Sequence, residues 1–141
     1  MGRILAIDYG KKRTGIAVTD VLQIIATPLQ TFPSDEVMAF LKNYTQSEEV
    51  DEFVVGMPVT LKNEDSDIAP LVRAFVAELQ KNFPDKNIVL ADERFTSKMA
   101  MDAMIQGGMK KSDRRNKGNV DKISATIILQ SYMERRSGTR R

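Results

Sequence analysis

The stretch ILAIDYGKKRTGIAVTD, residues 4–20, contains two short apolar runs joined by a basic turn with a glycine. The runs RILAID at 3–8 and TGIAVT at 14–19 have the length and composition of strands, and the turn between them is short enough for an antiparallel hairpin. The first run ends on Asp8, a carboxylate placed where a buried strand meets the turn. This hairpin therefore predicts the start of a β-sheet with a charged group at its edge.

The residues after the hairpin predict a third strand and a first helix. Residues 23–31 read QIIATPLQT, which we interpret as a strand. Pro28 within this run has no amide proton to donate, and this favours the edge of the sheet. Ser34 is a suitable N-cap for a helix that continues to about Gln46, because its hydroxyl can accept a hydrogen bond from the first turn.

Two strand–helix units follow, which is the pattern of a parallel sheet with helical crossovers. The run EFVVGMP at 52–58 shows no polar alternation, as expected for a strand buried on both faces. The later predicted elements are a helix at about 68–82, a buried strand at 87–91, a helix near 97–106 and a last helix at about 120–135. We therefore predict one α/β domain over residues 1–141. Its mixed five-stranded sheet has antiparallel hairpin strands first and parallel strands after them, with helices on both faces.

The amino-acid composition indicates the class of protein. The chain has 141 residues, 42% of them hydrophobic, and a mean hydropathy of -0.30, which are typical of one soluble globular domain. No apolar run approaches the ~20 residues of a membrane helix. We expect no secretion signal and a cytoplasmic location.

The sequence has no His and no Cys, which excludes imidazole bases, thiol nucleophiles and zinc sites built on those ligands. Any metal would be a hard cation such as Mg or Mn, held by oxygen atoms.

Three carboxylates stand at the ends of predicted elements. Asp8 ends the first strand, Glu93 follows the strand at 87–91, and Asp121 opens the last helix on the same stripe as Ala125. Each acid also has a purely structural explanation. Asp8 is a residue type that favours turns, and Glu93 can lie exposed beside Asp92 and pair with Arg94. Asp121 suits the positive N-terminal end of the helix dipole. If the last helix crosses the sheet near the strand ends, the three acids converge. Their mutual repulsion would then predict a divalent cation between them.

Basic residues are grouped along the chain, although the formal net charge is only +2. Acidic residues concentrate between residues 35 and 67. Such clusters are common on a solvated surface, but the asymmetry is also compatible with one basic face that binds a polyanion. The candidate nucleic-acid contacts are Lys11, Lys12, Arg13, Arg94, Lys110, Lys111, Arg114, Arg115 and Lys117.

Four motifs of this chain closely resemble the YqgF family. They are RILAIDYGKKRTGIAV at 3–18, VGMP at 55–58, DERFTS at 92–97 and KGNVDKISATIILQ at 117–130. The family comprises bacterial RNase H-like proteins described as candidate Holliday junction resolvases and as nucleases that mature the small-subunit ribosomal RNA precursor. The resemblance implies an RNase H-like fold with Asp8, Glu93 and Asp121 as metal-binding catalytic acids. It also implies that metal-activated water cleaves a phosphodiester.

The resemblance leaves the substrate and the oligomeric state open. Related resolvases usually carry two acids one turn apart on the last helix, whereas this chain has only Asp121 there, and Asp20 or Asp92 would have to serve a second metal. We expect hydrolysis of structured nucleic acid by a monomer or homodimer, first at the 5′ end of pre-16S ribosomal RNA in ribosomal precursor particles. Resolution of DNA junctions is the alternative substrate. A non-catalytic RNA- or ribosome-binding module is the alternative class, while an actin-like ATPase needs a duplicated domain for which this chain is too short.

Overall fold

The computed structural model describes the backbone of residues 2–57, 68–92 and 117–139 and, within these, all side chains except those of residues 92, 117–121 and 136–139. The described strands are β1 (Arg3–Tyr9), β2 (Arg13–Thr19), β3 (Ala26–Pro33), β4 (Val50–Met57) and β5 (Asn87–Asp92). The described helices are the 3-10 turn η1 (Ser34–Glu36), α1 (Val37–Ser47), α2 (Ala69–Asn82) and α5 (Lys117–Thr139). The helix predicted near 97–106 lies outside the described residues.

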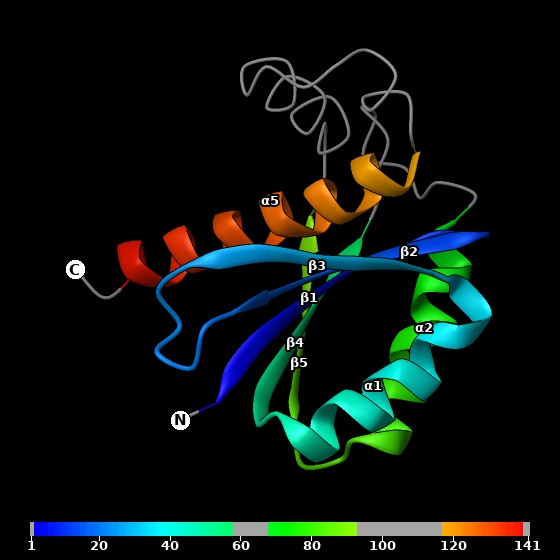
Figure 1. Cartoon of the computed structure of the whole chain (residues 1–141), viewed down its shortest axis with the longest axis horizontal. Coiled ribbons are helices and arrows are strands. Elements are labelled where there is room, and N and C mark those ends of the chain that lie inside the picture. Colours follow the sequence, from blue (N-terminus) through cyan, green and yellow to red (C-terminus); the bar gives the residue numbers. More distant parts are fainter. Residues whose placement is uncertain (1, 58–67, 93–116, 140–141) are drawn as a thin grey trace.

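The five strands form one mixed sheet in the order β3-β2-β1-β4-β5. The β1–β2 and β2–β3 pairs are antiparallel, and the β1–β4 and β4–β5 pairs are parallel. Helices α1 and α2 cover one face of the sheet, and α5 crosses the other (Figure 1). The predicted mixed sheet, its strand directions and the edge position of β3 are therefore confirmed.

Alternation along β1 divides its side chains between two hydrophobic cores. Leu5 and Ile7 pack on the side of α1 and α2, whereas Ile4 and Ala6 pack on the side of α5. Strand β4 contributes buried residues to both cores, as the continuous apolar run predicts.

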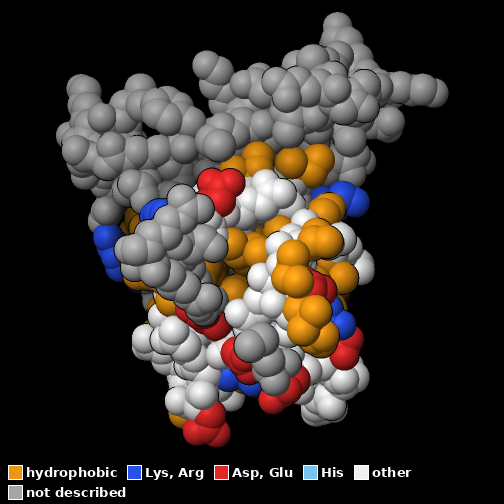
Figure 2. Space-filling view, turned by 90° about the vertical axis from the view of Figure 1, so that its left-hand side faces the viewer, with side chains coloured by type: hydrophobic (Ala, Val, Ile, Leu, Met, Phe, Trp, Pro, Cys, Tyr) orange, Lys and Arg blue, Asp and Glu red, His pale blue; other side chains and the backbone are white. Residues whose placement is uncertain are grey.

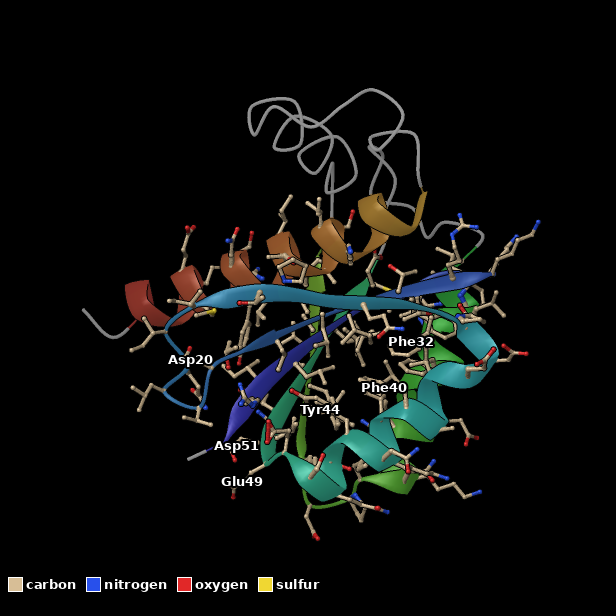
Figure 3. All side chains as sticks on the ribbon, viewed as in Figure 1. Asp20, Phe32, Phe40, Tyr44, Glu49 and Asp51 are labelled. Carbon is tan, nitrogen blue, oxygen red and sulfur yellow. The ribbon has the colours of Figure 1, made fainter. Side chains whose placement is uncertain are left out.

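Stacked aromatic side chains pack α1 against the edge strand β3. The ring centroids of Phe32 and Phe40 lie 4.3 Å apart, and those of Phe40 and Tyr44 lie 5.4 Å apart (Figure 3). Burial raises the pKa of the Tyr44 hydroxyl above its usual value. The packed side of α1 is thus formed by residues at helical spacing, namely Val37, Phe40, Leu41 and Tyr44.

Three sequence predictions were wrong in detail. Strand β3 begins at Ala26 and not at residue 23, because the Asp20 carboxylate accepts hydrogen bonds from the Ile24 and Ile25 amides and holds them in a loop. Ser34 does not cap a helix; it starts η1, and its hydroxyl is bonded elsewhere. Strand β5, predicted as a buried strand, is an edge strand in which Leu90 is 50% exposed.

Among the described helices, none combines the length and the apolar character needed to span a membrane.

Candidate active site at the carboxyl edge of the sheet

Asp8 lies near the carboxyl end of β1 and belongs to the α5 side of the sheet. The alternation that sends Ile4 and Ala6 toward α5 places residue 8 on the same side. Asp8 is half-buried and interacts with other groups of the protein. The carboxyl ends of β4 and β5 lie at the same edge, because both strands run parallel to β1 and pair in register up to Met57 and Asp92. Asp8 is thus at the edge where ligands of parallel sheets bind.

Two glycines flank Asp8 on the α5 side. Gly15 of β2 is directly opposite Asp8 in the antiparallel ladder, and directly paired residues share a face. In β4, Gly56 follows Val55, the partner of Ile7, and pairs with Ala91 of β5. The row across the sheet at this level is therefore Gly15, Asp8, Gly56, Ala91, and only Asp8 carries a large side chain. Within this row, neither strand beside β1 therefore places a large side chain next to the carboxylate.

The basic β1–β2 turn is held at the same edge. A side chain at Gly10 would clash with the backbone carbonyl of Arg13, so the tight turn requires glycine there. The Ser34 hydroxyl donates to the Gly10 carbonyl at 2.5 Å, and its amide donates to the Lys12 carbonyl at 3.0 Å. These bonds anchor the turn to η1, with Lys11 and Lys12 exposed and Arg13 half-buried.

Helix α5 is the element that covers this face. Its residues Ala125, Ile128 and Leu129 pack in the core formed with Ile4 and Ala6. The Tyr132 hydroxyl donates to Oε1 of Glu52 in β4, which joins the helix to the sheet. Position 121 lies one turn before position 125 on the same helical stripe, at the end of α5 that begins at Lys117.

One of the three predicted acids is fully described. Glu93 lies outside the described residues, and Asp121 lies in α5 with its side chain undescribed. Consistent with this, the described residues contain no group of three acidic side chains that could hold a metal ion. Of the predicted nucleic-acid contacts, Lys117 has only its backbone described, and Arg94, Lys110, Lys111, Arg114 and Arg115 lie outside the described residues.

Asp20 is the wrong candidate for a second metal. It follows Thr19 at the opposite end of the hairpin from Asp8, since Leu5 pairs with Val18 and Asp8 with Gly15. Its carboxylate already accepts 2.8 Å and 2.9 Å hydrogen bonds from the Ile24 and Ile25 amides. Asp92 does end β5 at the site edge, but its side chain is not described.

Sequence reasoning missed the two glycines and Ser124. Gly15 and Gly56 occur in the quoted motifs TGIAV and VGMP, and their spacing from Asp8 in a paired sheet was the signal that could have identified them. Ser124 is 1% exposed on α5, and its hydroxyl has no hydrogen-bond partner within the described part of the chain. A buried hydroxyl without a partner is unfavourable unless another group uses it.

The family model RuvX, described as Holliday junction resolvase, matches residues 2–135. The chain belongs to the RuvX/YqgF family. It is 53% identical over 133 residues to a protein of Amoebophilus asiaticus, covering 94% of both chains. It is 54% identical over 134 residues to a protein of Phocaeicola vulgatus, covering 95% of this chain and 96% of the relative. Both relatives carry the name "Putative pre-16S rRNA nuclease".

Solved structures confirm the fold of this RuvX/YqgF member. The RuvC protein of T. thermophilus, solved in complex with a Holliday junction substrate, superposes with a TM-score of 0.59 at 17% identity and covers 99% of this chain and 98% of its own. A second Thermus thermophilus RuvC structure gives a TM-score of 0.59 at 13% identity, covering 97% of each chain. The RNase H-like fold expected from the family resemblance is thus confirmed.

Proposed function

We propose that this RuvX/YqgF member is a metal-dependent nuclease that hydrolyses phosphodiesters in structured RNA, with the precursor of 16S ribosomal RNA as its substrate. The observation that carries the proposal is the placement of Asp8 at the carboxyl edge, flanked by Gly15 and Gly56 on the face that α5 covers. The names of the relatives supply the substrate class. The reaction would take place in the cytoplasm, on ribosomal precursor particles.

The residues present fit a hard divalent cation. The chain has no His and no Cys, so oxygen atoms are its available ligands, and Mg and Mn prefer such ligands. Gly15 and Gly56 place no side chain on either side of the Asp8 carboxylate, where we propose that the ion binds. Asp8, Glu93 and Asp121 would hold the ion. Once bound, it would lower the pKa of a water molecule and offset negative charge on the phosphate.

The topology supports the proposed approach of the three acids. Glu93 directly follows β5, and β5 is separated from β1 by β4 alone, a span of about 10 Å at two strand spacings. Asp121 stands on the stripe of α5 that packs on the sheet. The proposal therefore assigns one ligand to each of three elements that share this edge.

The basic turn would hold the substrate. Lys11 and Lys12 are exposed on a turn that Ser34 fixes beside the carboxyl edge, so their ammonium groups can contact phosphates next to the scissile bond. Arg13, Arg94, Lys110, Lys111, Arg114, Arg115 and Lys117 are proposed as further phosphate contacts. In this proposal the basic and acidic residues have different roles. The Lys and Arg side chains bind the RNA backbone, and the acids take part in cleavage of one phosphodiester.

The deciding experiment compares cleavage of pre-16S RNA, and of the precursor particle, by wild type and Asp8→Asn in Mg or Mn. Asp85→Asn is the matched control, since Asp85 is exposed at the opposite end of the fold, just before β5. We expect Asp8→Asn to lose cleavage and Asp85→Asn to retain it. Equal cleavage by Asp8→Asn and wild type would remove Asp8 from the mechanism. Calorimetric titration with Mn, in the same three proteins, reports ion binding without reference to activity.

A second substrate has its own support. The matching family model is described as Holliday junction resolvase, and a four-way DNA junction presents the same phosphodiester chemistry. A homodimer would be required to cut two strands, so junction assays should be paired with a measurement of mass in solution. Salt-sensitive RNA binding without cleavage, unchanged by Asp8→Asn and without an ion site, would instead identify a non-catalytic RNA-binding module.

A further inference from the structure

The loop between β2 and β3 exposes large aliphatic side chains. The fractional exposure is 50% for Val21, 65% for Leu22, 65% for Ile24 and 63% for Ile25. Single exposed aliphatic residues are ordinary, but four within five positions form a contiguous patch, and such patches on soluble proteins mark interaction sites. We call these four residues the aliphatic loop. Figure 2, which views this end of the molecule, shows hydrophobic side chains gathered at the surface, with acidic side chains and a few Lys or Arg side chains around them.

Hydrogen bonds within the segment define the backbone conformation of the aliphatic loop. Oδ1 of Asp20 accepts from the Ile24 amide at 2.8 Å and from the Ile25 amide at 2.9 Å. The Gln23 amide donates to the Asp20 carbonyl at 3.0 Å, and Gln23 adopts a left-handed backbone conformation with φ of 59°. A loop ordered before binding loses less conformational entropy when a partner arrives.

Hydrogen bonds of Gln23 connect the aliphatic loop to Gly2 and to Asp51. Nε2 of Gln23 donates to the Gly2 carbonyl at 2.7 Å and lies 3.4 Å from Oδ2 of Asp51. The Gly2 amide donates to the same oxygen of Asp51 at 2.8 Å. Asp51 at the start of β4 therefore lies next to the loop, and the left-handed residue Gln23 is the one that reaches it. The hydrogen bonds of the Gln23 side chain offset the cost of its left-handed conformation.

The described hydrogen-bond network beside the aliphatic loop is rich in carboxylates. Asp20 and Asp51 are both part of the hydrogen-bonded network, and Glu49 lies on the same side of the molecule (Figure 3). Arg3 bonds the Thr19 carbonyl at 2.9 Å, but its charge is offset by a 3.1 Å ion pair with Glu48. Within this described network, carboxylates outnumber cations. A polyphosphate is therefore disfavoured here, and cationic groups are favoured.

The loop and the proposed active site lie at opposite ends of the β1–β2 hairpin. Asp8 pairs near the turn at residues 10–12, whereas Asp20 follows the far end of β2. Seven-residue strands place these ends about 20 Å apart. A partner on the aliphatic loop would leave the carboxyl edge of the sheet open.

We propose that the aliphatic loop docks a protein segment in which aliphatic side chains are flanked by Lys or Arg. The aliphatic residues would bury Leu22, Ile24 and their neighbours, and the basic residues would approach Asp20 and Asp51. RNA fits poorly because its phosphates would meet the same carboxylates. A second copy joined by a twofold axis through this loop would bring Asp20 and Asp51 of both copies together.

The test uses three synthetic peptides of one length, alternating leucine with lysine, leucine with glutamate, and serine with lysine. Binding is measured by calorimetry and by amide chemical shifts of residues 20–25. We expect the leucine–lysine peptide alone to bind and to shift these amides. The double variant Leu22→Ser, Ile24→Ser should weaken its affinity by about tenfold or more. The control is Leu71→Ser, because the Leu71 side chain is 43% exposed on α2, away from the loop. This variant should leave the affinity unchanged.

Four outcomes would overturn the proposal. They are equal binding of the leucine–glutamate peptide, unchanged affinity in the double variant, shifts of the loop amides on addition of naked precursor RNA, and concentration-dependent self-association that the double variant abolishes. The double variant should cleave naked RNA as wild type does, because the loop is remote from Asp8. Failure of the docking proposal is thus distinguishable from failure of the nuclease proposal.

Discussion

Tyr132 of α5 donates its hydroxyl proton to Oε1 of Glu52 in β4, joining residues 80 positions apart. Glu52 is only 7% exposed, and the same oxygen accepts a 3.1 Å hydrogen bond from Nδ2 of Asn87. A carboxylate buried to this degree is stable only while such donors remain. Glu52 is level with Ile4 in the sheet, so this contact anchors α5 several residues away from Asp8 and fixes the direction in which the helix crosses.

Replacing Tyr132 by Phe should therefore destabilise the protein. The change removes a hydrogen bond to a charged, buried group, for which a loss of about 1–3 kcal/mol in the free energy of unfolding is expected. Urea denaturation followed by circular dichroism measures it. Tyr44→Phe is the control, because the Tyr44 hydroxyl has no hydrogen-bond partner in the described part of the structure. Equal stability of the two variants would show that the Glu52 contact contributes nothing.

Replacing Ser124 by Ala should have the opposite effect and stabilise the protein. The Ser124 hydroxyl is buried without a described partner, so its removal should raise the free energy of unfolding by about 1 kcal/mol. Thr126 on the same helix donates to the Lys122 carbonyl at 2.8 Å, and Thr126→Val should not stabilise. Thermal and urea unfolding of the two variants check this. A loss of stability in Ser124→Ala would mean that the hydroxyl has a partner in the folded protein.

Gly56→Ala should impair cleavage while the fold persists. The added methyl group would lie between Asp8 and Ala91 on the α5 side and fill the space proposed for the ion. We expect cleavage to fall by about 10- to 100-fold with cooperative unfolding retained. Gly138→Ala, near the far end of α5, serves as the control for adding one methyl group. Full activity in Gly56→Ala would show that the row of glycines has no part in the site.

The Asp20 carboxylate should make the aliphatic loop sensitive to acid. Hydrogen bonds from the Ile25 and Ile24 amides hold the pKa of this carboxyl below its ordinary value of 3.8. The folded pKa is the lower one, so the ionised carboxylate stabilises the loop above the unfolded pKa, and this contribution is lost as pH falls through the folded pKa. Amide shifts of Ile24 and Ile25 should therefore titrate below pH 3.8. They should not titrate in Asp20→Asn; a midpoint above that value would contradict the described hydrogen bonds.

Lys11→Gln and Lys12→Gln should weaken RNA binding in a salt-dependent manner. If each ammonium contacts one phosphate, each change should lower the slope of log affinity against log salt by about one. Lys42→Gln provides the control, since Lys42 is exposed on α1. Filter binding or fluorescence anisotropy over a salt series gives the slopes. Unchanged slopes in both turn variants would remove the β1–β2 turn from the RNA-binding surface.

Much of the fold could be predicted because its signals are local. The apolar runs that became β1 and β4, the proline that marks β3 as an edge strand, and the helical spacing in α1 and α5 each depend on residues close together in the chain. Residues 23–25 were wrongly predicted as the start of a strand, because Ile24 and Ile25 have strand propensity. The hydrogen bonds of Asp20 and Gln23 outweigh that propensity, and they form only in the folded chain.

By itself, the sequence determined the strand and helix periods, the absence of His and Cys ligands, and the position of Asp8 at a strand end. The tertiary structure decided which residues surround that carboxylate. Gly15 and Gly56 come from the two strands on either side of β1, and the Glu52–Tyr132 contact spans two elements that meet only when α5 crosses the sheet. Pairing register and helix packing are set by contacts summed over the whole core, and these pairs therefore become neighbours only in the folded chain.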